Sequence, residues 1–127
     1  MSSNQILELR VYKIHHGRRG EFAERMQSVL VPMFKRHGAE VVHHGLSLHD
    51  GDSYFLIRTF PSVAERQSRL DALYGSAEWL MNHEEAVLGM IDTYDTAVLE
   101  ADEWLIEVLK ERFETVRQDR ALTGGAA

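Results

Sequence analysis

The stretch Glu8-Leu9-Arg10-Val11-Tyr12 decides how this chain is read, because polar and apolar residues alternate strictly along it. Successive side chains of a β-strand point to opposite faces, so a strand here places Glu8, Arg10 and Tyr12 on one face. The other face carries the aliphatic residues Leu7, Leu9 and Val11. A face with an acid, a base and a phenol in line is either exposed to water or lines a cavity in which polar groups meet a ligand.

The composition indicates one globular domain. The chain has 127 residues, of which 44% are hydrophobic and 27% charged. Its net charge of −6 argues against nucleic acid as a partner. The absence of cysteine excludes disulfides, thiolate metal sites and cysteine nucleophiles. No apolar run is long enough for a membrane span and no secretory signal is visible, so we expect a cytoplasmic protein without a membrane partner.

Periodicity and turn signals predict an alternation of strands and helices. Pro32 is expected to kink the first helix near residues 28–31, and Gly38 to end it. Ser62 and Glu65 have the spacing of a capping box. The predicted strands are 6–14, 39–48, 53–60 and 93–100, and the predicted helical segments are 21–37, 62–75, 77–90 and 103–118, followed by a frayed tail at 123–127.

This order is β-α-β-β-α-β, the ferredoxin-like pattern of the α+β class. It predicts a four-stranded antiparallel sheet with helices on one face and an extra C-terminal helix. We expect one domain over residues 1–102, and a helix with a flexible tail over 103–127. The second face of the sheet is apolar, so we expect a second copy of the chain to cover it.

Several motifs together resemble the NIPSNAP family over roughly residues 6–99. They are Glu8-Leu9-Arg10-Val11-Tyr12, Gly17, Glu21-Phe22, Pro32-Met33-Phe34-Lys35-Arg36-His37-Gly38, Phe60-Pro61-Ser62-Val63-Ala64-Glu65-Arg66 and Ser76-Ala77-Glu78-Trp79. The resemblance implies the dimeric α/β-barrel superfamily, in which two ferredoxin-like protomers pair their sheets. That superfamily includes cofactor-free monooxygenases, haem-degrading enzymes, polyketide cyclases and lactone isomerases, with sites between the sheet and the helices. NIPSNAP-like proteins share no single defined activity.

The first strand supplies the main candidate site. In the functional interpretation Arg10 holds an anionic or enol oxygen, Glu8 orients Arg10, and Tyr12 donates a hydrogen bond. In the structural interpretation the same residues form an ion pair or a solvated face. Arg58, on the third strand, either joins the Glu8 cluster or marks an exposed or dimer face.

A second group of candidates lies on the helices. His83 is expected on an apolar helix face, either as a core histidine or as a general base or haem-facing ligand over the sheet. Tyr74 is a candidate to share the pocket with His83 as an acid or oxyanion donor. Trp79 is a core residue or a platform for the ligand. The adjacent pair His43-His44 points to opposite faces, so we expect no metal site there.

Three functions are compatible with these patterns. The first is a small-molecule site for a planar anionic or enolisable compound, either for binding alone or for catalysis of the cofactor-free monooxygenase, isomerase or cyclase type. The second is a haem-binding or haem-modifying protein, in which haem would be the only cofactor. The third is a non-catalytic binding or scaffold protein that works through the helix 103–118. All three are expected to act as a homodimer or a higher oligomer.

Overall fold

The computed structural model describes residues 4–123, with side chains as far as residue 113. Of the predicted tail 123–127, residue 123 is the last residue of the C-terminal helix, and residues 124–127 lie outside the described residues. In chain order the elements are β1 (Asn4–Ile14), α1 (Arg19–Arg25), the π-helical turn η1 (Met26–Leu30), α2 (Val31–Arg36), β2 (Glu40–Leu46), β3 (Ser53–Phe60), α3 (Val63–Tyr74), α4 (Ala77–Asn82), α5 (Glu84–Met90), β4 (Ile91–Asp102) and α6 (Glu103–Thr123).

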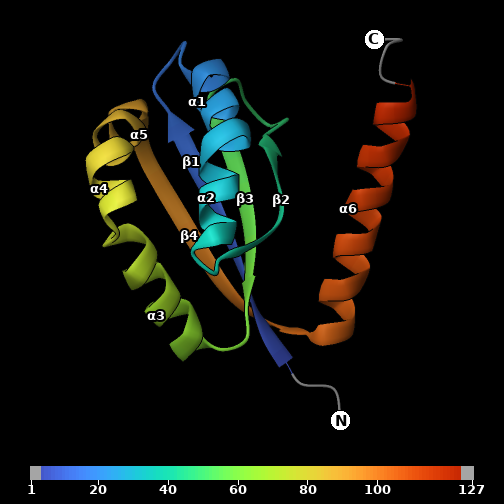
Figure 1. Cartoon of the computed structure of the whole chain (residues 1–127). Coiled ribbons are helices and arrows are strands. Elements are labelled where there is room, and N and C mark those ends of the chain that lie inside the picture. Colours follow the sequence, from blue (N-terminus) through green and yellow to red (C-terminus); the bar gives the residue numbers. More distant parts are fainter. Residues whose placement is uncertain (1–3, 124–127) are drawn as a thin grey trace.

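The sheet has four strands in the order β2-β3-β1-β4, and every neighbouring pair is antiparallel. This confirms the predicted ferredoxin-like α+β fold. The helices from α1 to α5 lie on one side of the sheet, and α6 lies apart from them on the other side (Figure 1). No helix within residues 4–123 has the length and apolar character that a membrane crossing needs.

The predicted helix 21–37 is one continuous rod with a local distortion, as Pro32 led us to expect. The π-helical turn Met26–Leu30 directly precedes α2, which has Pro32 in its first turn. Proline donates no backbone hydrogen bond and its ring crowds the carbonyl of the previous turn. A widened turn relieves that crowding, so the predicted kink is realised as a π-bulge. Gly38 follows the helix with a φ of +86°, a conformation that glycine adopts without strain.

The segment 77–90 is not the single helix that was predicted. It is broken at His83, whose φ of −131° and ψ of −32° lie outside the helical region, and α4 and α5 are therefore separate short helices. The hydroxyl of Ser76 caps α4 by accepting a hydrogen bond from the backbone N–H of Trp79. The same capping interaction, from Glu65 to Ser62, begins α3 as predicted.

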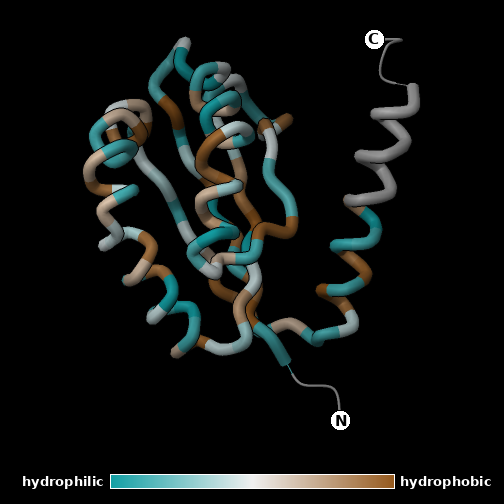
Figure 2. The backbone as a smooth tube through the Cα atoms, viewed as in Figure 1, coloured by the Kyte–Doolittle hydropathy of each residue, from teal (hydrophilic) through white to brown (hydrophobic). Residues whose placement is uncertain are grey.

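The main core fills the space between the sheet and the helices from α1 to α5, where apolar segments of both layers face each other (Figure 2). Its fully buried members include Phe22, Met26, Phe34, Leu56 and Leu73. Apolar burial of this kind supplies most of the stability of a small domain.

The opposite face of the sheet, which we expected a second copy of the chain to cover, is partly covered by α6 of the same chain. Ile106 is fully buried, the ring of Phe113 stacks on His43 with centroids 4.0 Å apart, and Lys110 pairs with Glu40 at 2.6 Å. Apolar side chains nevertheless remain exposed on or beside this face, among them Val11, Leu99 and Leu105. The edge strand β4 is exposed along residues 92–100.

A polar-walled cavity between sheet and helices

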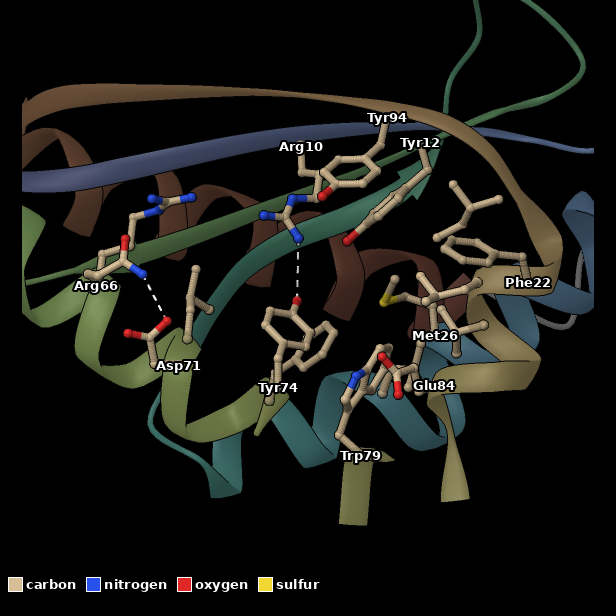
Figure 3. Close-up of a pocket in the computed structure, with 17 residues that line it drawn as sticks. Arg10, Tyr12, Phe22, Met26, Arg66, Asp71, Tyr74, Trp79, Glu84 and Tyr94 are labelled. Carbon is tan, nitrogen blue, oxygen red and sulfur yellow. Dashed lines mark hydrogen bonds between the residues drawn. The ribbon is translucent and has the colours of Figure 1, made fainter. Parts of the chain in front are cut away.

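A cavity of about 470 Å³ lies between the sheet and its helices, within the size range of small-molecule sites. Arg10, Tyr12 and Tyr94 line it from the sheet side, as Figure 3 shows. The apolar part of its lining comes mainly from α1 to α5 and includes Phe22, Met26, Leu30, Phe34, Leu70 and Val87. The lining residues that are exposed to solvent, Gln67, Asp71, Leu88 and Tyr94, mark a mouth between α3, α5 and β4.

Beside the cavity, on the same face of the sheet, lies a buried ion cluster centred on Glu8. The strand register sets Glu8 directly opposite Arg58, and neither side chain is exposed. The Nη2 of Arg58 lies 2.6 Å from Oε1 of Glu8, and the Nε of Arg66 donates to Oε2 at 2.7 Å. Each carboxylate oxygen is thus held by a guanidinium, which is the arrangement a buried charge requires.

Arg10 is the cation of this cluster that is least engaged. Its Nη2 is 4.0 Å from Glu8, while its Nε donates to Thr96 at 3.2 Å and its Nη1 donates to the hydroxyl of Tyr74 at 3.4 Å. The guanidinium lies 5.0 Å from the ring centroid of Tyr94, and its side chain is 12% exposed. Arg10 therefore carries its charge at the cavity wall without a close carboxylate partner.

The electrostatics of the wall favour an anion. Burial opposes the ionised form of Glu8, but the charges of Arg58 and Arg10 and the hydrogen bonds from Arg66 and Arg58 hold its pKa below the usual value. One carboxylate and three guanidiniums leave an excess of two positive charges in this cluster. Burial also raises the pKa of Tyr12, so its phenol keeps a proton that it can offer to a ligand.

Tyr74 connects the cluster to the cavity. Its hydroxyl oxygen accepts hydrogen bonds from Arg58 at 3.0 Å and from Arg10 at 3.4 Å. With its oxygen accepting from two cations, the hydroxyl can point its own proton toward a ligand. The ring of Trp79 packs edge-on against Tyr74, with centroids 5.1 Å apart, and forms part of the cavity floor.

The structure brings together most of the residues that the sequence singled out. Arg10, Tyr12, Tyr74 and Trp79 all line the cavity. Glu8 and Arg58 lie beside the cavity without lining it: Arg58 donates to the hydroxyl of Tyr74, and Glu8 lies 4.0 Å from Arg10. Of the two alternatives for Arg58, the structure shows the first, since Arg58 is buried and joins the Glu8 cluster.

His83 is not at this cavity, and its placement there was wrong. The break between α4 and α5 turns it to a separate surface hollow that it lines with Arg18, Met81 and Glu85. Among the described residues none of those that line the main cavity is a histidine, and no group of three or more potential metal ligands is present. Within residues 4–113, therefore, no imidazole lines the cavity to bind a haem iron.

Polar lining residues that sequence reasoning missed include Gln67 and Asp71 on α3, Glu84 on α5 and Tyr94 on β4. Glu84 follows Leu80 by four residues and precedes Leu88 by four, a spacing that places a carboxylate on an apolar helical stripe. This charged residue within an apolar stripe is the sequence signal from which Glu84 could have been predicted as a site residue.

The fold and the site define a ferredoxin-like α+β protein with an arginine- and tyrosine-walled cavity under its helices. The NIPSNAP family model matches residues 7–105, and the chain belongs to the NIPSNAP family. The resemblance noted in the sequence is thereby confirmed.

Several solved structures share this fold although their sequences differ widely from that of this chain. A NIPSNAP family protein with unknown function from Agrobacterium tumefaciens is 17% identical with a TM-score of 0.70, over 80% of this chain and 95% of that one. An uncharacterized NIPSNAP domain protein from Burkholderia xenovorans is 15% identical with a TM-score of 0.66, over 74% and 91%. A putative antibiotic biosynthesis monooxygenase from Nitrosomonas europaea is 10% identical with a TM-score of 0.62, over 80% and 93%. No curated protein matches the chain significantly.

Proposed function

We propose that this protein binds a planar, partly apolar small molecule that carries a carboxylate or an enolisable carbonyl, in the cavity between sheet and helices. The observation that carries the proposal is the state of Arg10, a guanidinium at the cavity wall whose nearest carboxylate, Glu8, is already held by Arg58 and Arg66. A planar guanidinium offers paired donors that match a carboxylate or enolate.

The rest of the lining supports a flat, apolar ligand body. Phe34, Trp79 and Met26 present rings and a thioether across from the polar wall. Tight small-molecule sites commonly combine such an apolar lining with a few convergent polar groups. The ligand's oxygen would lie against Arg10 and Tyr74, and its apolar body against the helices.

The same wall is suited to catalysis without a cofactor. Arg10, Tyr12 and Tyr74 could stabilise negative charge that develops on a substrate oxygen, because they are fixed donors in a largely buried site. This favours proton-transfer chemistry of the isomerase or cyclase type, or oxygenation of a bound carbanion. The fold shared with the putative monooxygenase from Nitrosomonas europaea is compatible with these reactions, and a fold alone does not select one.

A second copy of the chain is the partner that we propose, in the cytoplasm. Val11 and Leu99 remain 37% and 49% exposed on the strands β1 and β4. Apolar exposure of this kind on a sheet face is typical of protein–protein contacts. Since α6 already covers part of this face, the second copy would pack on the remaining part.

The binding proposal can be tested by calorimetric titration with cinnamate, a planar carboxylate, and with cinnamamide, its uncharged analogue. We expect cinnamate to bind and the variant Arg10→Met to bind it at least about tenfold more weakly, since one charge-assisted hydrogen bond contributes on the order of 1.5–3 kcal/mol. Arg25→Met, on α1 and outside the cavity, is the matched control. Equal affinity for acid and amide, or equal binding by the two variants, would refute the role of Arg10.

A further inference from the structure

Glu84 carries an acidic group to the cavity from the side opposite the arginine wall. It lies in the first turn of α5, it is half-buried, and it is one of the lining residues. Figure 3 shows its carboxylate on the helix side of the cavity, whereas Arg10 and Tyr12 extend from the sheet side. A ligand between the two sides would thus meet hydrogen-bond donors on one face and a carboxylate on the other.

The other titratable candidates are placed differently. Asp71 also lines the cavity, but it is exposed at the mouth and accepts a hydrogen bond from Gln67 at 2.8 Å. His83 lines the separate hollow. Within residues 4–113 no hydrogen bond or ion pair engages the carboxylate of Glu84. Glu84 is therefore the lining carboxylate that is both partly shielded from solvent and available to a ligand.

We propose that Glu84 is the general base of an enolisation, and that the substrate is a 2-oxo acid with a planar aromatic substituent. This inference rests on the proposed function, because it needs the carboxylate and keto oxygens of the substrate to lie against Arg10 and Tyr74. Those two adjacent oxygens match the donors that Arg10 offers from β1 and Tyr74 offers from the end of α3. The carbon next to the keto group then faces the helix side, where Glu84 lies.

The reaction conserves all atoms and needs no co-reactant. The carboxylate of Glu84 takes a proton from the carbon next to the keto group, and the electrons of that C–H bond form the C=C bond. The electron pair of the C=O bond moves to the oxygen, where Arg10 and the hydroxyls of Tyr74 and Tyr12 stabilise the charge. Return of the proton from Glu84 to the same carbon restores the keto form, and exchange of the proton on Glu84 with solvent in the meantime brings a solvent proton to that carbon. A positioned general base contributes roughly 10²–10⁴-fold to such a step.

Phenylpyruvate is the probe for this step. Deuterium uptake at its C3, followed by proton NMR in D₂O, reports enolisation, and calorimetric titration reports binding. Glu84→Gln keeps the shape of the side chain and removes the base, while Glu85→Gln makes the same change at the neighbouring exposed position outside the cavity. We expect the unaltered protein and Glu85→Gln to accelerate exchange equally. Glu84→Gln should lose the acceleration by about 100-fold or more while keeping its affinity within about threefold.

The outcomes separate this inference from the binding proposal. Exchange that is equally fast in Glu84→Gln overturns the assignment of the base. Binding of phenylpyruvate without faster exchange overturns the enolisation and leaves the binding proposal standing. Binding of cinnamate but not of phenylpyruvate overturns the 2-oxo acid as the substrate class. Failure to bind either acid removes the proposed function, and the enolisation with it.

Discussion

Removing the charge of Glu8 should strongly destabilise the fold. The variant Glu8→Gln leaves Arg58 fully buried without its counter-ion, at a position where its Nη2 now lies 2.6 Å from a carboxylate oxygen. Breaking a buried ion pair from one side costs about 3–5 kcal/mol. Arg66 adds little to this cost, because it is 18% exposed and can turn toward water. We therefore expect the free energy of unfolding to fall by about 3–5 kcal/mol at pH 7.

Urea denaturation followed by circular dichroism measures this loss. The control Glu24→Gln, at an exposed position of α1, should change the free energy of unfolding by no more than about 0.5 kcal/mol. The double variant Glu8→Gln/Arg58→Met removes both buried charges and should be more stable than Glu8→Gln alone. A loss below about 1 kcal/mol for Glu8→Gln would show that water reaches Arg58, which contradicts the sealed cluster described above.

The pH dependence gives a second measurement of the same cluster. The pKa of Glu8 is lowered from its ordinary value of 4.5 in the folded protein, mainly because the nearby arginine charges outweigh burial. Its ionised form therefore contributes full stability above about pH 4.5, and this contribution is lost as the pH falls through the lower folded-state pKa. The difference in unfolding free energy between the unaltered protein and Glu8→Gln should shrink on acidification. A difference that stays constant down to the acid limit would refute this linkage.

Three further predictions test other parts of the molecule. Tyr74→Phe removes the hydroxyl that accepts from Arg58 and Arg10; we expect a stability loss of about 1.5–3 kcal/mol and weaker cinnamate binding, and unchanged denaturation would contradict it. Val11→Asp, on the outer sheet face, should shift size-exclusion elution from dimer to monomer, whereas Met81→Asp at an 82% exposed position of α4 should not; a monomeric unaltered protein would refute the sheet pairing. Gly38→Ala forces a side chain into a φ of +86° and should cost about 1–2 kcal/mol in thermal unfolding experiments, whereas Gly20→Ala, within α1 and with nothing within 4 Å, should be neutral or stabilising.

Local patterns predicted the fold because each of them had a direct physical cause. Alternation in the first strand placed Glu8, Arg10 and Tyr12 toward the helices, where the structure finds them. Pro32 predicted the disturbance that became a π-helical turn, and Gly38 predicted the end of the helix.

The site was predicted only in part, because its lining depends on how helices pack rather than on any single segment. The break at His83 leaves little trace in the periodicity, yet it decides that His83 leaves the cavity and that Glu84 enters it. Strand alternation therefore predicts the sheet side of the cavity. The helix side depends on where α4 ends and α5 begins, which tertiary contacts determine.

The position of β4 at the border of the sheet also bears on how copies of the chain can associate. The unpaired backbone N–H and C=O groups of an edge strand can pair with a strand of another chain, and repeated pairing leads to fibrous aggregates. Here Asp92, Asp95 and Glu100 are spread along it, all exposed. An identical strand docking in antiparallel fashion would bring like charges together, so ribbon-like growth through β4 is penalised at neutral pH. Acidic solutions that neutralise these carboxylates should be the conditions under which the protein first forms insoluble assemblies.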